Sequence, residues 1–355
     1  MPSPVHRAPA GGARRLSRAG TALLTVLLLL PVAAAFATVR FSDDEPRAVV
    51  EQPPQVQRVV AGHSVLSVRR VVAGTEVDKI DLEALRRERE ARLREKAQRA
   101  AAKAAEAADN APFSVRIGSF NVLGSQHTAP GGTRQNYPPA STRTAATANL
   151  VGKHGVDILG AQEMQSDQLR DLQNRTGMAA WPGFAWGEAE TDNSVLYDPG
   201  VFEVVSGSSF TIPFMGRPRP QPIVRLRHLA TGRELYVVNT HPSAGGGSYV
   251  AERRQGQAAL VGVVNDLKSQ GIPVLVTGDM NDREEFYCRV VAQAGLIAPN
   301  GGSYSAGCQP PPQPLPVDWV VGLGATWSEY WRDTTPVTQK ISDHYFISAR
   351  ASIGD

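Results

Sequence analysis

The chain has 355 residues, and its 37 Lys and Arg against 34 Asp and Glu give a net charge of +3. That charge is unevenly distributed, because residues 1–110 hold 18 basic and 13 acidic side chains while residues 111–355 hold 19 and 21. Residues 111–355 therefore carry a net charge close to −2, so the net charge gives no support for a nucleic-acid-binding surface. Local basic patches remain open, with Arg217, Arg219, Arg225 and Arg227 as candidates.

Residues 1–39 predict an export signal. Arginines at positions 7, 14, 15 and 18 precede an uncharged stretch, residues 19–39, which contains an Ala35-x-Ala37 pattern typical of signal cleavage. At ~1.5 Å per residue this stretch also spans a bilayer core, so a cleaved signal peptide and an uncleaved signal anchor fit equally. In both cases we expect an exported protein, secreted or tethered to the outer face of the cytoplasmic membrane. Sec and twin-arginine export both stay open.

Residues 40–78 read as a spacer, and residues 79–110 as a charged, Ala-rich helix. Helix-forming residues dominate the second segment, and Glu83–Arg87, Glu88–Arg92 and Glu90–Arg94 are spaced i, i+4. Apolar positions are too sparse for a coiled coil, so the pattern favours a solvated helical stalk. An ordinary helix packed on the following domain is the alternative.

From residue 111 the sequence changes to short apolar strands, glycine turns and amphipathic helices, which predicts one α/β domain over 111–355. In chain order we expect a strand at 114–120, a loop at 125–141, helices at 143–153 and 166–176, and a strand at 156–161 between them. Strands at 194–197, 202–205, 223–229 and 234–239, a long helix at 250–269 and a strand at 272–277 follow. A short helix carrying Cys288, a proline-rich loop at 309–316 and strands at 317–321 and 345–349 complete the domain.

The chain has two cysteines, Cys288 and Cys308. Export to an oxidising compartment favours joining them in a disulfide. No further ligands are spaced to make a two-cysteine metal site. Closing a loop of about 20 residues would contribute roughly 3 kcal/mol in the chain-entropy model.

Polar side chains recur where the predicted strands end or begin, which is where open sheets place their sites. Each has a structural alternative, such as a turn or capping residue for Asn121, Asn281 and Glu163, or a buried structural histidine. Asp318 within an apolar strand is harder to explain that way, because an unpaired buried carboxylate is costly. The residues are Asn121, Glu163, His241, Asp279, Asn281, Asp318, Asp343 and His344.

The ordered set of motifs that carries these residues resembles the endonuclease/exonuclease/phosphatase superfamily, which has the DNase I-like fold. The motifs are Ser119-Phe120-Asn121, Gln162-Glu163, Asn239-Thr240-His241, Gly278-Asp279-Met280-Asn281, Val317-Asp318-Trp319 and Ser342-Asp343-His344. The resemblance implies a four-layer α/β sandwich, in which two packed mixed β-sheets are flanked by helices. It also implies metal-dependent hydrolysis of a phosphoester.

By this resemblance Glu163 is the main metal ligand, assisted by Asn121 and Asp343. Oxygen ligands of this kind suit Mg²⁺, with Mn²⁺ or Ca²⁺ as alternatives. Asp279 would orient or deprotonate the attacking water, and Asn281 would hold a phosphate oxygen. His344, polarised by Asp318, would act as acid/base, with His241 on the other side of the phosphate. Some members of this family pair the second histidine with a glutamate; the corresponding partner of His241 is not fixed, and Asn193, Glu188 and Glu190 are the candidates.

Three classes of function compete. The first is an exported phosphodiesterase, in particular an endonuclease acting on DNA or RNA as a monomer. The second keeps the fold but takes a phospholipid head group, as sphingomyelinases do, or a small phosphoester; the Trp-Cys-Asp-Arg signature of inositol polyphosphate 5-phosphatases is absent. The third is a non-enzymatic surface-binding module. An uncleaved N-terminal segment would add the membrane as a partner.

Overall fold

The computed structural model describes residues 82–109 and 111–354. The predicted signal and spacer lie outside the described residues, so export stays a prediction. Within the described residues, no helix combines the length and the apolar character that crossing a membrane requires. The charged segment forms helix α1 (Leu82–Asp109) as expected, with i, i+4 ion pairs such as Arg92–Glu88 at 2.5 Å and Arg99–Glu95 at 2.6 Å. Its role as a stalk remains a prediction.

The rest of the described chain contains two mixed β-sheets, as the fold class predicted. The six-stranded sheet has the order β10-β11-β1-β2-β4-β3 and the five-stranded sheet the order β5-β6-β7-β8-β9. Their strands are β1 (Phe113–Asn121), β2 (Ile158–Gln162), β3 (Ala179–Trp181), β4 (Ser194–Tyr197), β5 (Phe202–Phe214), β6 (Arg217–His228), β7 (Glu234–Thr240), β8 (Val274–Asp279), β9 (Asp318–Leu323), β10 (Thr326–Asp333) and β11 (Phe346–Ile353). The pairs β1–β2 and β7–β8 are parallel, and the other paired strands are antiparallel.

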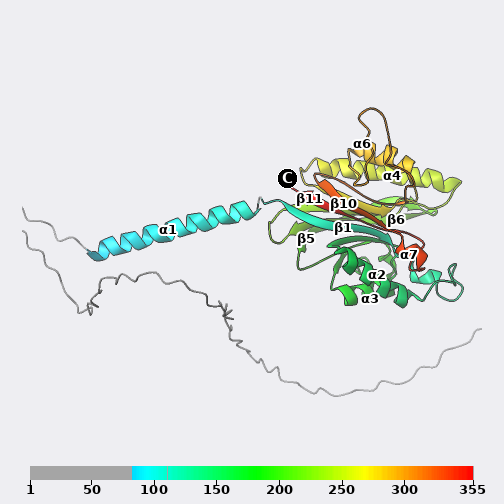
Figure 1. The fold of residues 1–355 in the computed structure, drawn as a ribbon, viewed down its shortest axis with the longest axis horizontal. Helices are drawn as coiled ribbons and strands as arrows, with labels where there is room; N and C mark the ends of the chain where they lie inside the picture. Colours follow the sequence, from blue (N-terminus) through cyan, green and yellow to red (C-terminus); the bar gives the residue numbers. More distant parts are fainter. Residues whose placement is uncertain (1–81, 110, 355) are drawn as a thin grey trace, which may run out of the picture. The chain divides into compact units, whose positions relative to one another are not determined.

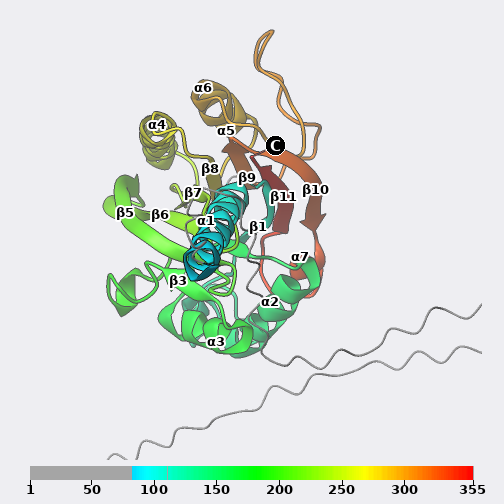
Figure 2. The same cartoon turned by 90° about the vertical axis from the view of Figure 1, so that its left-hand side faces the viewer.

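Helices cover the outer face of each sheet, which completes four layers. Helices α2 (Ala140–His154) and α3 (Ser166–Thr176) lie on one side, and α4 (Ser248–Lys268) lies on the other with the helical segment α5 (Glu284–Phe286), η3 (Tyr287–Val291) and α6 (Ala292–Ala294) (Figures 1 and 2). Short turns η1 (Ser125–His127), η2 (Glu188–Glu190) and α7 (Thr335–Thr338) lie in the connections. One apolar cluster fills the space between the sheets, and each outer interface has its own.

The hairpin of β5 and β6 is longer than the sequence indicated. The sequence predicts strands at 202–205 and 223–229 with no strand between them, and prolines at 218, 220 and 222 are unfavourable in a central strand. In the structure β6 pairs with β5 from Arg217 onward, but with β7 only from Ile223. The three prolines recur at every second position, so the edge of β6 on which they lack an N–H donor is the edge away from β5. Over residues 217–222 no strand pairs with that edge, because β7 begins to pair only at Ile223, and the prolines are therefore tolerated.

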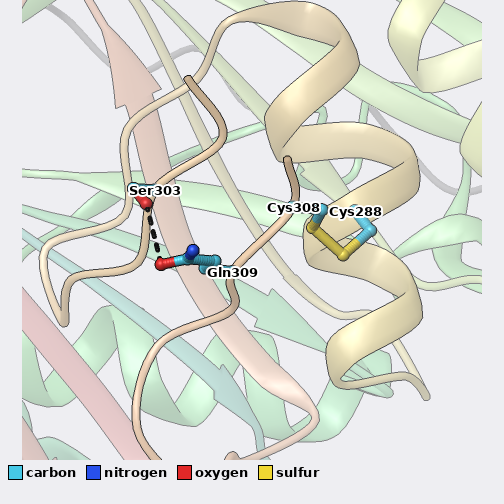
Figure 3. The surroundings of a disulfide bond; sticks show 4 residues. All are labelled: Cys288, Ser303, Cys308 and Gln309. Carbon is cyan, nitrogen blue, oxygen red and sulfur yellow. Dashed lines mark hydrogen bonds between the residues drawn. A yellow bond between two sulfur atoms is a disulfide. The ribbon is translucent and has the colours of Figure 1, made fainter. Parts of the chain in front are cut away.

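Cys288 and Cys308 form a disulfide, with their Cα atoms 5.5 Å apart. The bond joins the π-helical turn η3 to the loop that follows α6 (Figure 3). In that loop the backbones of Ser303 and Gln309 exchange two hydrogen bonds of 2.8 Å, and their side chains lie 3.5 Å apart. The disulfide therefore attaches this exposed loop to the helical layer.

Replacing both cysteines by serine is expected to lower the free energy of unfolding by about 3 kcal/mol, because the unfolded chain regains the entropy of an open loop of roughly 20 residues. Urea denaturation of the variant and of the oxidised protein measures this difference. Chemical reduction of the unmodified protein is the control and should give the same loss. A change below about 1 kcal/mol in both would contradict the expected contribution.

Candidate active site

The predicted functional residues converge at one edge of the two sheets. Because β1 and β2 run parallel in one sheet and β7 and β8 in the other, four carboxyl ends meet there, carrying Asn121, Glu163, His241 and Asp279. A cavity of about 220 Å³ opens at this point. Six of the eight predicted residues line it: Glu163, His241, Asp279, Asn281, Asp343 and His344. The other two, Asn121 and Asp318, are buried behind it.

Asp279 lies at the centre of the group and is 1% exposed. Its Oδ2 accepts a hydrogen bond from Asn121 Nδ2 at 3.1 Å and lies 3.3 Å from His241 Nε2 and 3.5 Å from His344 Nε2. Its Oδ1 accepts the backbone N–H of Asn281 at 2.9 Å. Burial alone would raise the pKa of Asp279, but the two histidines and these donors outweigh it and hold the pKa well below its usual range. The side chain is therefore a carboxylate that accepts hydrogen bonds.

His344 connects Asp279 to Asp318. Its Nδ1 lies 2.9 Å from Asp318 Oδ1, while its Nε2 faces Asp279. Burial lowers the pKa of His344, but the two carboxylates raise it well above 6.5. The ligand atoms of these three residues lie within 4.8 Å of one another, a spacing that could also hold a metal ion. We interpret the group as a carboxylate–imidazole relay, because each ring nitrogen already faces one carboxylate oxygen.

Glu163 also lines the cavity, and its backbone is in a left-handed conformation, with φ of 59°. Such a conformation is uncommon for a residue other than glycine, and it turns the side chain out of the end of β2. Its carboxylate accepts Asn121 Nδ2 at 2.9 Å and lies 3.2 Å from His127 Nε2. Burial raises the pKa of Glu163, but the hydrogen bond from His127 and the charge of His241 outweigh it and lower the pKa to about 2.

Asn121 bridges the two carboxylates. Its Nδ2 donates to both Glu163 and Asp279, and its Oδ1 accepts the backbone N–H of Leu123 at 3.0 Å. In this arrangement Asn121 orients the two acids, and its amide oxygen faces the backbone. Asn281 likewise has its Nδ2 on the backbone oxygen of Pro242 at 3.0 Å. The predicted roles of Asn121 as a metal ligand and of Asn281 as a phosphate contact remain proposals.

No candidate partner reaches the ring of His241. Its Nδ1 is buried and has no hydrogen-bond partner among the described residues. Asn193 instead donates to Gln221 Oε1 at 3.1 Å, and the same oxygen accepts the backbone N–H of His241 at 2.7 Å. Glu188 pairs with Arg170 at 2.8 Å. A glutamine on β6 that the sequence did not single out therefore fixes the backbone of His241.

Two further side chains enter the cavity from the loop after β1, and the sequence did not point to either. His127 contacts Glu163, and that hydrogen bond raises the pKa of His127 above 6.5. Arg134 donates from Nη2 and Nε to Asp343 Oδ2 at 2.9 and 3.1 Å. Both lie in a Gly/Pro-rich segment without periodicity, so no sequence pattern fixes where their side chains point.

The buried guanidinium of Arg143 on α2 holds that loop in place. It is 1% exposed and donates to oxygen atoms from three segments around the site. The acceptors are the backbone oxygens of Val122, Leu123, Gly124, Pro138 and Ile341 and the hydroxyl of Thr128. Arg143 thereby ties the end of β1 and the loop that contains His127 to the segment entering Ser342-Asp343-His344.

A buried polar network joins the sheets directly beneath the site. Gln162 Nε2 donates to Asn239 Oδ1 at 2.7 Å, and Asn239 Nδ2 donates to the backbone oxygen of Ala161 at 2.7 Å. Ser119 Oγ accepts the backbone N–H of Gly278 at 3.0 Å. The sheets approach so closely that a Cβ on Gly160 would collide with the side chain of Thr277. These contacts fix the position of Glu163, at the end of β2, relative to Asp279, at the end of β8.

The fold and the site together define an α/β sandwich with an acid–histidine centre at its sheet edge. Residues 118–344 match the model of the Endonuclease/Exonuclease/phosphatase family, and the chain belongs to that family. Its members are phosphoester hydrolases that generally depend on a divalent metal. None of the curated proteins searched matches the chain.

Solved structures agree on the fold. An endonuclease/exonuclease/phosphatase from Bacteroides vulgatus is 17% identical with a TM-score of 0.52, covering 68% of this chain and 99% of that one. The human Nocturnin catalytic domain with bound sulfate is 19% identical with a TM-score of 0.52, covering 67% and 94%. Truncated Caenorhabditis elegans TDP2 is 18% identical with a TM-score of 0.50, covering 67% and 97%.

Proposed function

We propose that the protein is an exported, metal-dependent phosphodiesterase, and specifically an endonuclease. The observation that carries the proposal is the buried, ionised carboxylate of Asp279, held between two histidines on a cavity that Glu163 and Asp343 also line. This is an arrangement for activating water next to a phosphate whose charge is neutralised from the other side. A pure binding module has no need to bury an acid between two histidines.

The donor set suits a hard divalent cation. Glu163 and Asp343 supply carboxylate oxygens to one cavity, and the pKa of Glu163 near 2 keeps it ionised over the working pH range. We propose that these two residues hold Mg²⁺, with Asn121 orienting Glu163, and with Mn²⁺ or Ca²⁺ as alternatives. The bound ion would supply charge neutralisation at the phosphate.

The protein groups divide the remaining work. Asp279 orients the attacking water through a hydrogen bond or takes up its proton; its lowered pKa keeps it an ionised carboxylate, which is the form that either role needs. His344, whose raised pKa keeps it protonated near neutral pH, donates to a phosphoryl oxygen from the same cavity. Asp318 fixes the orientation of the His344 ring through Nδ1 and stabilises its positive charge. His241 faces the cavity from the other sheet.

Supercoiled plasmid incubated with the purified protein and Mg²⁺ is expected to be nicked, and an Asp279→Ala variant should leave it intact. The same preparations are offered sphingomyelin vesicles, which test the phospholipid alternative. If the unmodified protein nicked no more plasmid than the variant, the proposed nuclease activity would be excluded. Phosphocholine release without nicking would instead establish that the substrate is a phospholipid.

Export rests on the N-terminal sequence, and the disulfide fits an oxidising compartment. Expression of the full chain in its native host, followed by N-terminal sequencing of the protein recovered outside the cytoplasm, tests it. A mature N-terminus near residue 38 is expected for a cleaved signal, and an intact, membrane-bound chain for an anchor. Recovery in the cytoplasm alone would contradict export.

A further inference from the structure

A second cavity of about 320 Å³ lies directly beside the reaction cavity. The two share four lining residues, namely His127, Glu163, His241 and Ala244. The remaining lining comes from the end of the β5–β6 hairpin (Phe214, Met215, Arg217 and Arg219), from turn η1 (Gln126), and from the segments before α3 and β4 (Gln165 and Asp192). A group bound in this second cavity would therefore lie next to a phosphate bound in the reaction cavity.

Two arginines, Arg217 and Arg219, and two carboxylates, Glu163 and Asp192, line the second cavity. Arg219 is 8% exposed, forms an ion pair with Asp192 and stacks 4.2 Å above the ring of Phe214. Its charge is therefore balanced, and its position is fixed. Arg217 lies at the exposed rim, and within residues 82–109 and 111–354 no hydrogen bond or ion pair from its guanidinium is found. It is a cation available to a ligand.

The rim that carries Arg217 is held firmly. Phe214 and Arg217 face each other as the last pair of the hairpin, and the turn between them uses positive φ at Met215 (52°) and Gly216 (84°). Such a turn matches the twist of a two-residue hairpin. The backbone N–H of Met215 donates to Ser243 Oγ at 2.9 Å, which ties the turn to the segment just after His241.

We propose that this second cavity binds an anionic group of the substrate next to the scissile diester, such as a neighbouring phosphate of a polynucleotide, with Arg217 as the specificity-determining residue. The inference rests on the proposed phosphodiesterase function and deepens it. A guanidinium pairs with a phosphate through two parallel hydrogen bonds. A quaternary ammonium group, as in phosphocholine, prefers open aromatic faces, and the guanidinium of Arg219 already covers a face of Phe214.

Three chromogenic diesters that share a p-nitrophenyl leaving group separate these cases. They are the p-nitrophenyl ester of thymidine 5′-phosphate with a 3′-phosphate, the same ester without the 3′-phosphate, and p-nitrophenyl phosphocholine. The flanking group is then anionic, uncharged or cationic. We expect kcat/KM with Mg²⁺ to fall in that order for the unmodified protein.

Arg217→Ala is expected to raise KM for the 3′-phosphorylated ester about tenfold, which corresponds to ~1.4 kcal/mol, with little change for the unphosphorylated ester. Arg217→Glu should make the 3′-phosphorylated ester the poorer of the two thymidine substrates. Arg175→Ala is the matched control, because Arg175 is an exposed arginine on α3 whose side chain pairs with Asp171 outside both cavities.

The outcomes distinguish the two levels of the proposal. Two results would overturn the anion site without affecting the proposed phosphodiesterase activity. They are an equal kcat/KM for the two thymidine esters, and a loss of kcat/KM in Arg217→Ala that is the same for all three substrates. Preferred turnover of the phosphocholine ester would also overturn it. No turnover of any ester with Mg²⁺, Mn²⁺ or Ca²⁺ would refute the phosphodiesterase itself, and the anion site with it.

Discussion

Asp279→Asn is expected to lower kcat for phosphodiester hydrolysis by about 10²–10⁴-fold, the range for loss of a positioned acid–base group. The amide is nearly isosteric, but it removes the negative charge that faces His241 and His344 and presents a donor where the water needs an acceptor. Steady-state rates on a chromogenic diester at saturating Mg²⁺ measure the loss, which should fall on kcat more than on KM.

Asp266→Asn is the matched control for that variant, because Asp266 is exposed on α4 and lies outside both cavities. It should keep the full rate. Thermal melts establish that both variants are folded. If the Asp279→Asn protein retained more than a tenth of kcat, Asp279 would not be the group that orients or deprotonates the attacking water.

Glu163→Gln is expected to weaken Mg²⁺ binding by about 100-fold or more, because it replaces the ionised carboxylate that we propose holds the ion with a neutral amide at the same position. The pKa of Glu163 near 2 means that this carboxylate is charged in every buffer used for the assay, so protonation does not blur the comparison. Isothermal titration with MgCl₂ measures the affinity directly. The rise in melting temperature that Mg²⁺ gives the unmodified protein should shrink in parallel.

Glu188→Gln serves as the control for the metal measurement, since Glu188 has 69% of its side chain exposed and pairs with Arg170 outside the reaction cavity. Its Mg²⁺ affinity should equal that of the unmodified protein. An unchanged Mg²⁺ affinity in Glu163→Gln would show that Glu163 does not hold the metal. The group of Asp279, Asp318 and His344 would then be the next site to test.

The order of the strands and their polar ends could be read from sequence because each is a local signal. An apolar run followed by Gly-Asp or Gln-Glu marks where a buried strand meets the sheet edge, and parallel pairing brings such ends together. From these signals we expected Glu163, His241, Asp279 and His344 to lie at one sheet edge, and in the structure all four line one cavity. The sequence also identified Asp318 as a buried acid in need of a partner, and the structure places His344 there.

His127, Arg134 and Gln221 could not be found in that way. The loop that carries His127 and Arg134 is held by Arg143, which donates to the hydroxyl of Thr128 and to backbone oxygens, one of them 198 residues away in the chain. Gln221 lies among alternating prolines on β6, where local sequence argues against a strand and only pairing with β5 makes one. In each case the deciding contacts are tertiary, and no local pattern encodes them.

The proposed function requires a divalent cation and Asp279 to act together on a phosphodiester. The most direct measurement is the rate of p-nitrophenol release from bis(p-nitrophenyl) phosphate by the unmodified protein as Mg²⁺ is titrated from a chelated, metal-free start. The rate should be absent after chelation, rise with Mg²⁺ and saturate. A rate that is independent of Mg²⁺, or no release at saturating Mg²⁺ near neutral pH, would contradict it.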